Sequence, residues 1–186
     1  MARGFKRTRK GIVGRFEAPE VRLLQKLFSD VAETLAPEPR DTDDPLEALV
    51  GWDEDVAEPT DPALRRLLPA ASSDPEQAAE FRRLTDRSLR ERRIAALRAS
   101  SLALESDPVV LTTEQVQDVA RALNDVRLVL ASRLGIDSPQ DAERVAELTD
   151  FGTAQTVEQY MGVVYNFVSW LQETLMEALL KTLPSS

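Results

Sequence analysis

The hydrophobic pattern is most regular between residues 111 and 136. Apolar residues recur there at spacings of three and four, which places them on one side of a helix. They are Val116, Val119, Leu123, Val126 and Leu130. Thr112 and Gln115 form a capping-box pattern at the start, and Gly135 stands where a left-handed C-terminal residue belongs. Start, body and end agree, so the sequence predicts a helix around which the rest of the chain packs.

Three other long segments have a helical pattern, residues 19–35, 75–104 and 156–180. The core candidates of the second are Phe81, Leu84, Leu89, Ile94, Leu97 and Leu102. The last is apolar on most sides, which predicts that it lies deep in the bundle or at a subunit contact. Shorter helices are predicted at 62–68 and 140–148. The expected fold class is therefore mainly α, an irregular bundle of four principal helices.

A β-hairpin is predicted ahead of the helices. The segments Phe5–Arg9 and Ile12–Phe16 flank Lys10-Gly11, and glycine allows the positive φ of a tight turn. A two-stranded hairpin alone is marginally stable. The β-branched run Val109–Leu111 is therefore expected to add a short third strand near 109–111.

Length and charge favour a single helical domain over residues 1–186 with one acidic insertion. The net charge is −9, and residues 37–61 alone hold ten acids and one base, which also sums to −9. The Pro-rich composition of 37–60 predicts a mobile segment. Within it, the apolar residues of Pro45–Trp52 suggest one short docked helix.

The absence of Cys and His excludes several chemistries. Disulfides, thiolate nucleophiles, Ser-His-Asp triads and zinc sites built from Cys or His all need these residues. We therefore expect no cofactor, no metal site and no catalytic residue that can be named. No apolar run approaches the roughly 18 residues of a membrane span, and no apolar segment follows the basic N-terminus. The cytoplasm is the expected compartment, without membrane contact.

A candidate polar cluster lies in the most apolar helix, at Asn124, Asp125 and Arg127. One interpretation is a buried site in which Arg127 binds a carboxylate or phosphate. The other is a structural network in which Arg127 pairs with a carboxylate such as Glu173. The structural interpretation is favoured because buried charges are normally paired.

A candidate interaction surface is formed by basic residues and one tryptophan. Its members are Arg65, Arg66, Arg83, Arg87, Arg90 and Trp52. Together with the basic N-terminus, the arginines of 75–104 are compatible with a nucleic-acid surface. The acids Glu80, Asp86 and Glu91 equally allow ordinary surface ion pairs, and the acidic segment is expected to act as a spacer, a cover for this helix or a partner motif.

Three stretches together resemble a known family: DPALRRLLP, AAEFRRLTDRSLR and LTTEQVQDVARALNDVRLVL. Leu171-Gln172-Glu173 in the aromatic last helix also fits. The chain resembles an actinobacterial domain-of-unknown-function family, DUF2017, over nearly its whole length. The resemblance implies an uncharacterised protein whose relatives are sometimes labelled regulators and sometimes encoded beside the Clp protease adaptor.

The functional prediction follows from the resemblance and from the missing chemistry. We predict a non-enzymatic regulatory or adaptor protein that acts through protein–protein contacts, with an unidentified protein partner or a homodimer formed through the 156–180 helix. The alternative is a nucleic-acid-binding transcriptional regulator that uses the Arg-rich helix and the basic N-terminus. A third alternative is an enzyme with an arginine and carboxylate site. A deep polar pocket around Arg127 would favour the enzyme, and an uncovered arginine surface the nucleic-acid regulator.

Overall fold

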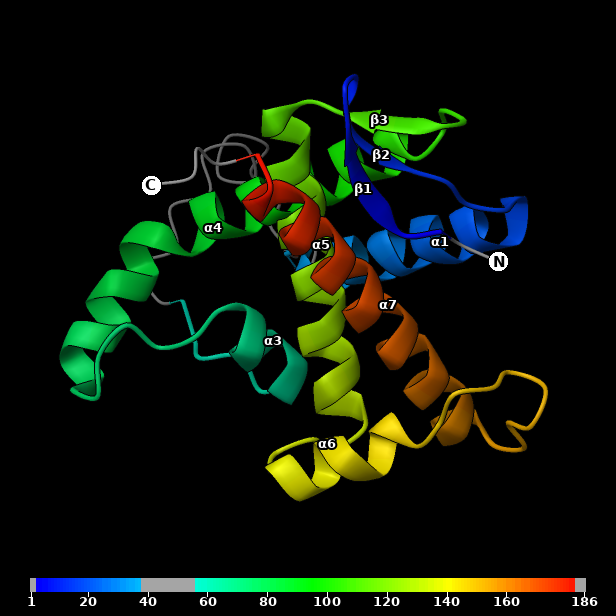
Figure 1. Ribbon diagram of the computed structural model, residues 1–186. Helices are drawn as coiled ribbons and strands as arrows, with labels where there is room; N and C mark the ends of the chain where they lie inside the picture. The colour runs from blue at the N-terminus through cyan, green and yellow to red at the C-terminus, as the bar shows by residue number, and fades with distance from the viewer. Residues whose placement is uncertain (1–2, 38–55, 183–186) are drawn as a thin grey trace, which may run out of the picture.

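The computed structural model describes residues 3–37 and 56–182. In chain order the elements are β1 (Phe5–Thr8), β2 (Gly11–Gly14), α1 (Ala18–Leu35), α3 (Pro62–Leu67), α4 (Pro75–Ala103), β3 (Val109–Leu111), α5 (Thr113–Arg133), α6 (Pro139–Ala146) and α7 (Val157–Leu180). The predicted class is confirmed: the protein is mainly helical, with a β-hairpin and a short third strand (Figure 1). The helix predicted within Pro45–Trp52 lies outside the described residues.

Helix α5 lies at the centre of the bundle and contacts α1, α3, α4 and α7 (Figure 1). Its predicted ends are confirmed. Thr112 accepts a hydrogen bond from the Gln115 backbone N–H at 3.3 Å, and the Gln115 side chain accepts one from the Thr112 backbone N–H at 2.9 Å. Gly135 has φ +63, and the Ile136 N–H donates to the Ala131 carbonyl at 2.9 Å. These bonds satisfy backbone groups that a helix end would leave unpaired.

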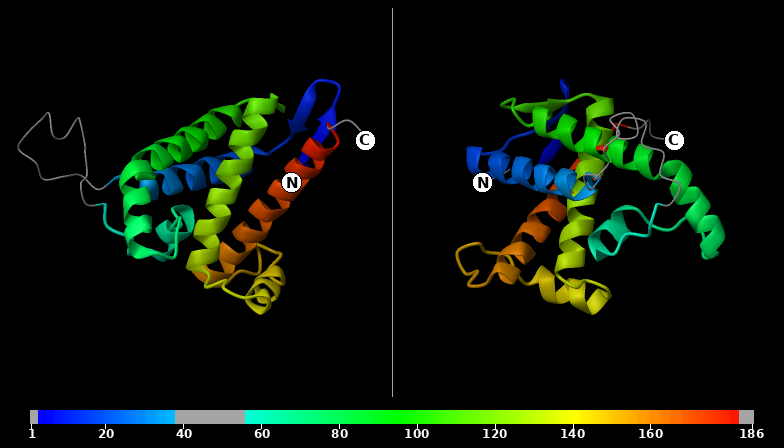
Figure 2. Two further views of the ribbon diagram at one scale, coloured as in Figure 1. Left: turned by 90° about the vertical axis from the view of Figure 1, so that its left-hand side faces the viewer. Right: turned by 180° about the vertical axis from the view of Figure 1, so that it is seen from behind.

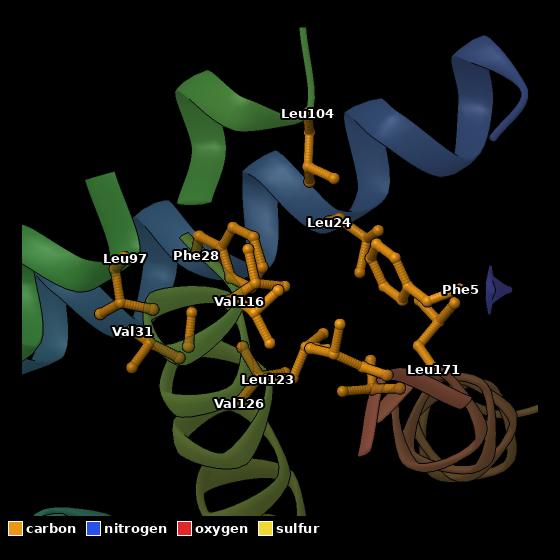
Figure 3. Packing of buried hydrophobic residues seen from close by; sticks show 14 of the residues in the cluster. Phe5, Leu24, Phe28, Val31, Leu97, Leu104, Val116, Leu123, Val126 and Leu171 are labelled. Atoms are coloured by element: carbon orange, nitrogen blue, oxygen red, sulfur yellow. The ribbon is translucent and has the colours of Figure 1, made fainter. Parts of the chain in front are cut away.

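The hydrophobic core forms where α1, α4 and α7 meet α5 (Figure 3). Phe28 of α1 and Leu123 of α5 are almost completely buried, as is Leu171 of α7. Phe5 of β1 reaches the same cluster from the sheet. The apolar stripe predicted for residues 116–130 is buried along its whole length. The central helix is therefore the element on which the other layers pack.

The sheet has the strand order β1-β2-β3, and both pairs are antiparallel. Thr8 pairs with Gly11, so the connecting residues are Arg9 and Lys10. The turn predicted at Lys10-Gly11 was therefore wrong by one residue. Gly11 begins β2 with φ +114, and its glycine character is needed there rather than at the tip.

The core prediction for α4 was only partly correct. Leu97 is fully buried, but Phe81, Leu84 and Leu102 are 46%, 63% and 65% exposed. The first turns of α4 extend beyond α1 and α5 toward the loop that follows α3, so less of the chain covers them (Figures 1 and 2). Helical periodicity identifies the apolar face of a helix, but a residue on that face is buried only where another element packs against that part of the helix. Within the described residues, no helix is long and apolar enough to cross a membrane.

Candidate functional site

The predicted polar cluster of α5 is divided between two sides of the helix. Successive residues are about 100° apart, so Asp125 and Arg127 point in nearly opposite directions. Asp125 faces α4, whereas Arg127 faces α7. Asn124 is half-buried and makes no side-chain hydrogen bond to any described residue. The predicted residues therefore do not form one site.

Asp125 is the most deeply buried charged group among the described residues, with 1% of its surface exposed. It forms an ion pair with Arg93 of α4 through Oδ1, while its Oδ2 has no hydrogen-bond partner. Burial raises the pKa of Asp125 to about 6, although the Arg93 guanidinium acts in the opposite direction. Desolvation thus outweighs the attraction of a single partner. Sequence reasoning missed Arg93, because no local spacing connects it to Asp125.

Arg127 bridges α5 and α7 without a carboxylate. Its Nε donates to Ser169 Oγ at 3.0 Å, and its Nη1 donates to Gln172 Oε1 at 2.7 Å. Its guanidinium carbon lies 5.8 Å from the centre of the Tyr165 ring, a cation–π distance. The predicted pair with Glu173 was wrong. Gln172 and Glu173 are consecutive on α7, so when one faces α5 the other turns away, and Glu173 is exposed.

Asp125 and Arg127 are both engaged in contacts between helices rather than directed at a groove of the described structure. A groove of about 300 Å³ lies between α1 and α4, with Phe28 and Leu97 in its lining and Glu33 and Arg98 also at its wall. Asp125 and Arg127 do not line this groove. Within residues 3–37 and 56–182, no three acidic side chains gather closely enough to hold a metal ion. The contacts of Asp125 join α5 to α4, and those of Arg127 join α5 to α7.

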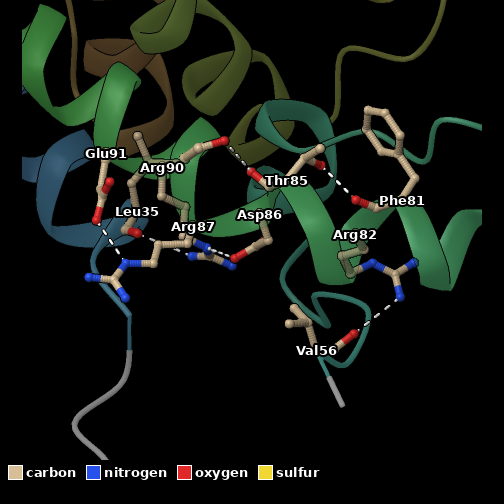
Figure 4. A network of polar contacts seen from close by, with 10 residues as sticks. Leu35, Val56, Phe81, Arg82, Thr85, Asp86, Arg87, Arg90 and Glu91 are labelled. Atoms are coloured by element: carbon tan, nitrogen blue, oxygen red, sulfur yellow. Dashed lines mark hydrogen bonds and ion pairs between the residues drawn. The ribbon is translucent and has the colours of Figure 1, made fainter. Parts of the chain in front are cut away.

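The predicted arginine surface on α4 is largely bonded within the protein (Figure 4). Arg83 pairs with Glu80 at 2.8 Å, and Arg87 with Glu91 at 2.9 Å. Arg90 is mostly buried; it donates to Asp86 at 2.6 Å and to the Leu35 carbonyl at 3.1 Å. That carbonyl lies at the C-terminal end of α1, where the unpaired carbonyls and the helix dipole favour a positive charge. Arg90 thus fixes α1 to α4.

Two further arginines hold the short helix α3 in place. Arg66 donates to the Ile136 carbonyl at 2.9 Å and pairs with Asp137, just after α5. Arg133 of α5 donates to both carboxylate oxygens of Asp61, at 3.1 and 2.7 Å. Asp61 is the N-cap of α3, and its pKa is lowered by hydrogen bonds from Ala63 and Arg133 against the opposing effect of desolvation. Arg65 is exposed, and Trp52 lies outside the described residues.

Replacing Arg127 with Met is expected to lower the free energy of unfolding by about 2 kcal/mol, because two charge-assisted hydrogen bonds between α5 and α7 are lost. The loss stays moderate because Ser169 and Gln172 are neutral and remain half-exposed to water. Urea denaturation followed by circular dichroism measures the change. A loss below about 0.5 kcal/mol, the range of ordinary surface substitutions, would show that Arg127 does not bridge the two helices.

The fold and its buried polar contacts define a mainly helical protein in which several arginines join one helix to another. The sequence matches the family described as Domain of unknown function (DUF2017) over residues 2–179, and the chain belongs to this family. No curated protein and no solved structure matches this chain. The resemblance to a domain-of-unknown-function family, inferred from the three sequence stretches, is confirmed.

Proposed function

We propose that this protein is a non-enzymatic regulatory or adaptor protein, and that it binds its partner through the outward side of α7. The observation that supports this proposal is a row of exposed or half-exposed aromatic side chains on that helix. Tyr160, Phe167 and Trp170 recur at spacings of seven and three, which places them on one side. Tyrosine and tryptophan are also the residues most enriched at the energetic centres of protein interfaces.

The aromatic residues form two neighbouring groups along α7. The Phe151 and Tyr160 rings lie 5.4 Å apart, and the Phe167 and Trp170 rings 6.2 Å apart. Val157, at the start of the helix, is 77% exposed. The opposite side of α7 packs on α5. Isolated exposed apolar residues are ordinary, but several together on one helix are typical of an interaction surface.

Replacing Tyr160 and Trp170 together with Ser is expected to abolish recovery of the partner when the protein is captured from native lysate and bound proteins are identified by mass spectrometry. Tyr160 and Trp170 are 46% and 38% exposed and lie outside the buried core, so the fold should be retained with some loss of stability. The matched control replaces Leu84 and Leu102, which are exposed on α4, with Ser. Nuclease treatment before capture removes proteins that are held only by nucleic acid.

Light scattering on the purified protein distinguishes a second copy from a different partner. A dimer that the α7 variant converts to a monomer would identify a homodimer formed through this helix. Retention of every partner by the α7 variant, or equal losses in both variants, would contradict the proposed surface.

The partner's identity rests on the family resemblance alone. If relatives are actinobacterial and encoded beside the Clp protease adaptor, regulated proteolysis is the process in which a partner would be sought. Direct titration of the purified protein with that adaptor tests this part of the proposal separately. Absence of binding would remove the link to proteolysis without affecting the role of α7.

A further inference from the structure

The N-terminal hairpin carries a concentration of positive charge that the helices do not neutralise. Residues 3–15 contain Arg3, Lys6, Arg7, Arg9, Lys10 and Arg15 and no acid. All six side chains belong to exposed residues. Among the described residues none of the six pairs with a carboxylate, in contrast to Arg83, Arg87 and Arg90 on α4. The basic surface that is free to bind an anion is therefore on the hairpin, and not at the predicted residues of α4.

The hairpin is held firmly against the body, so its charges are presented by an ordered platform. The Phe5 backbone N–H donates to Thr174 Oγ1 of α7 at 3.1 Å, and Arg7 donates to the Lys181 carbonyl at the end of α7. The buried Phe5 ring meets the Phe16 ring edge-to-face at 5.4 Å. Gly14 has to be small there, because a Cβ would approach both rings to 2.8 Å. A preorganised surface loses less entropy on binding than a disordered basic tail.

The tip of the hairpin extends beyond the third strand. β3 pairs only with Ile12–Gly14, so Thr8–Gly11 has a partner only within the hairpin. In Figures 1 and 2 this tip projects clear of the helices. Side chains alternate between the two faces of a strand, so Lys6 and Arg7 lie on opposite faces while Arg9 and Lys10 occupy the tip. The result is a narrow ribbon with cations on both faces and at its end.

We propose that this hairpin binds double-stranded DNA, inserting its tip into the major groove and contacting phosphates without sequence preference. A two-stranded β-ribbon fits the major groove of B-form DNA, and Arg and Lys supply the phosphate contacts. A flat anionic membrane surface would contact only one face of the ribbon. This proposal rests on the charge and the projecting tip of the hairpin, and it does not depend on the partner surface proposed on α7.

The net charge of −9 does not oppose this binding strongly. Removing the six cations of residues 3–15 leaves −15 for the remaining chain, since −9 − 6 = −15. At about 0.1 M salt the screening length is about 10 Å, so acids farther than this from the tip are largely screened from bound DNA. Contacts at the tip therefore determine the interaction.

The test compares the full-length protein with two double variants in a gel-shift titration on mixed-sequence duplex DNA, between about 50 mM and about 200 mM salt. The first variant is Arg9→Gln with Lys10→Gln. The matched control, Arg22→Gln with Arg98→Gln, removes the same charge from exposed positions on α1 and α4. The tip variant should bind about tenfold more weakly or worse at low salt, and its logarithmic salt slope should fall by about two. The control should change affinity less than about threefold.

Three results would overturn the proposal. They are no binding by the unmodified protein at low salt, an equal loss in the control variant, and binding to phosphatidylserine vesicles or an acidic peptide with none to DNA. Duplex RNA provides a further check, because the narrow major groove of A-form RNA does not admit the ribbon. Binding to duplex RNA as tight as binding to DNA would contradict insertion into the groove.

Discussion

Replacing Arg93 with Met is expected to lower the free energy of unfolding by about 3 kcal/mol at about pH 8. The variant removes Arg93, which is the ion-pair partner of Asp125 among the described residues. The Asp125 carboxylate is buried between α5 and α4, and its Oδ2 already lacks a hydrogen-bond partner there. Met retains most of the length and apolar volume of the side chain, so the loss reports the stranded charge more than lost packing. The same substitution at Arg127, whose partners are neutral, should cost less.

The cost of losing Arg93 should depend on pH in a direction set by Asp125. Its folded pKa of about 6 lies above the ordinary value of 3.8. Protonation of Asp125 therefore stabilises the folded protein. This stabilisation is fully present below about pH 3.8 and is lost as the pH rises through about 6. At about pH 5 the carboxyl is mostly protonated in the folded protein, the ion pair is already largely absent, and the loss in Arg93→Met should fall to about 1 kcal/mol.

Urea denaturation of both proteins at about pH 5 and about pH 8 measures this difference. Asp125→Asn supplies the control, because it removes the titrating group while keeping the shape of the side chain. In that background, Arg93→Met should cost the same at both pH values. An equal cost at both pH values in the unmodified background would instead show that Asp125 does not titrate in this range.

The ends of α5 could be predicted because their signals are local. Thr112 and Gln115 bond one another within a single turn, and Gly135 acts on the two residues around it. Such contacts depend on the backbone of a few neighbouring residues and little on the rest of the fold. The opposite holds for Phe81 and Leu84, whose place in the helical pattern is correct but whose exposure depends on how far α4 extends beyond its neighbours.

The division of the polar cluster was partly readable from the sequence. The angle between Asp125 and Arg127 follows from helix geometry alone and already excludes one shared site. Their partners could not be read in the same way, because Arg93 is 32 residues and Gln172 is 45 residues away along the chain. Which arginine meets which acid is decided by how α4 and α7 cross α5, and the spacing of residues within one helix does not determine that crossing.

Truncating Leu123 to Ala should lower the free energy of unfolding by about 3 kcal/mol, within the roughly 2–5 kcal/mol observed when buried leucines are removed. Leu123 of α5 is 1% exposed and belongs to the same buried cluster as Leu171 of α7, so a cavity there would loosen the packing of the two helices (Figure 3). Leu102→Ala is the matched control. It makes the same chemical change in a helix at a side chain that is 65% exposed, so its effect should stay within about 0.5 kcal/mol. Similar losses in the two variants, measured by urea denaturation, would contradict the position of α5 at the centre of the core.

The Leu123 variant should also affect the proposed partner surface. Because α7 packs on α5, loosening the core at Leu123 should weaken partner capture through the outward side of α7. Tyr160→Ser with Trp170→Ser should instead remove capture at a smaller cost in stability, because these two side chains are 46% and 38% exposed whereas Leu123 is 1% exposed. This contrast separates support of the surface from the surface itself.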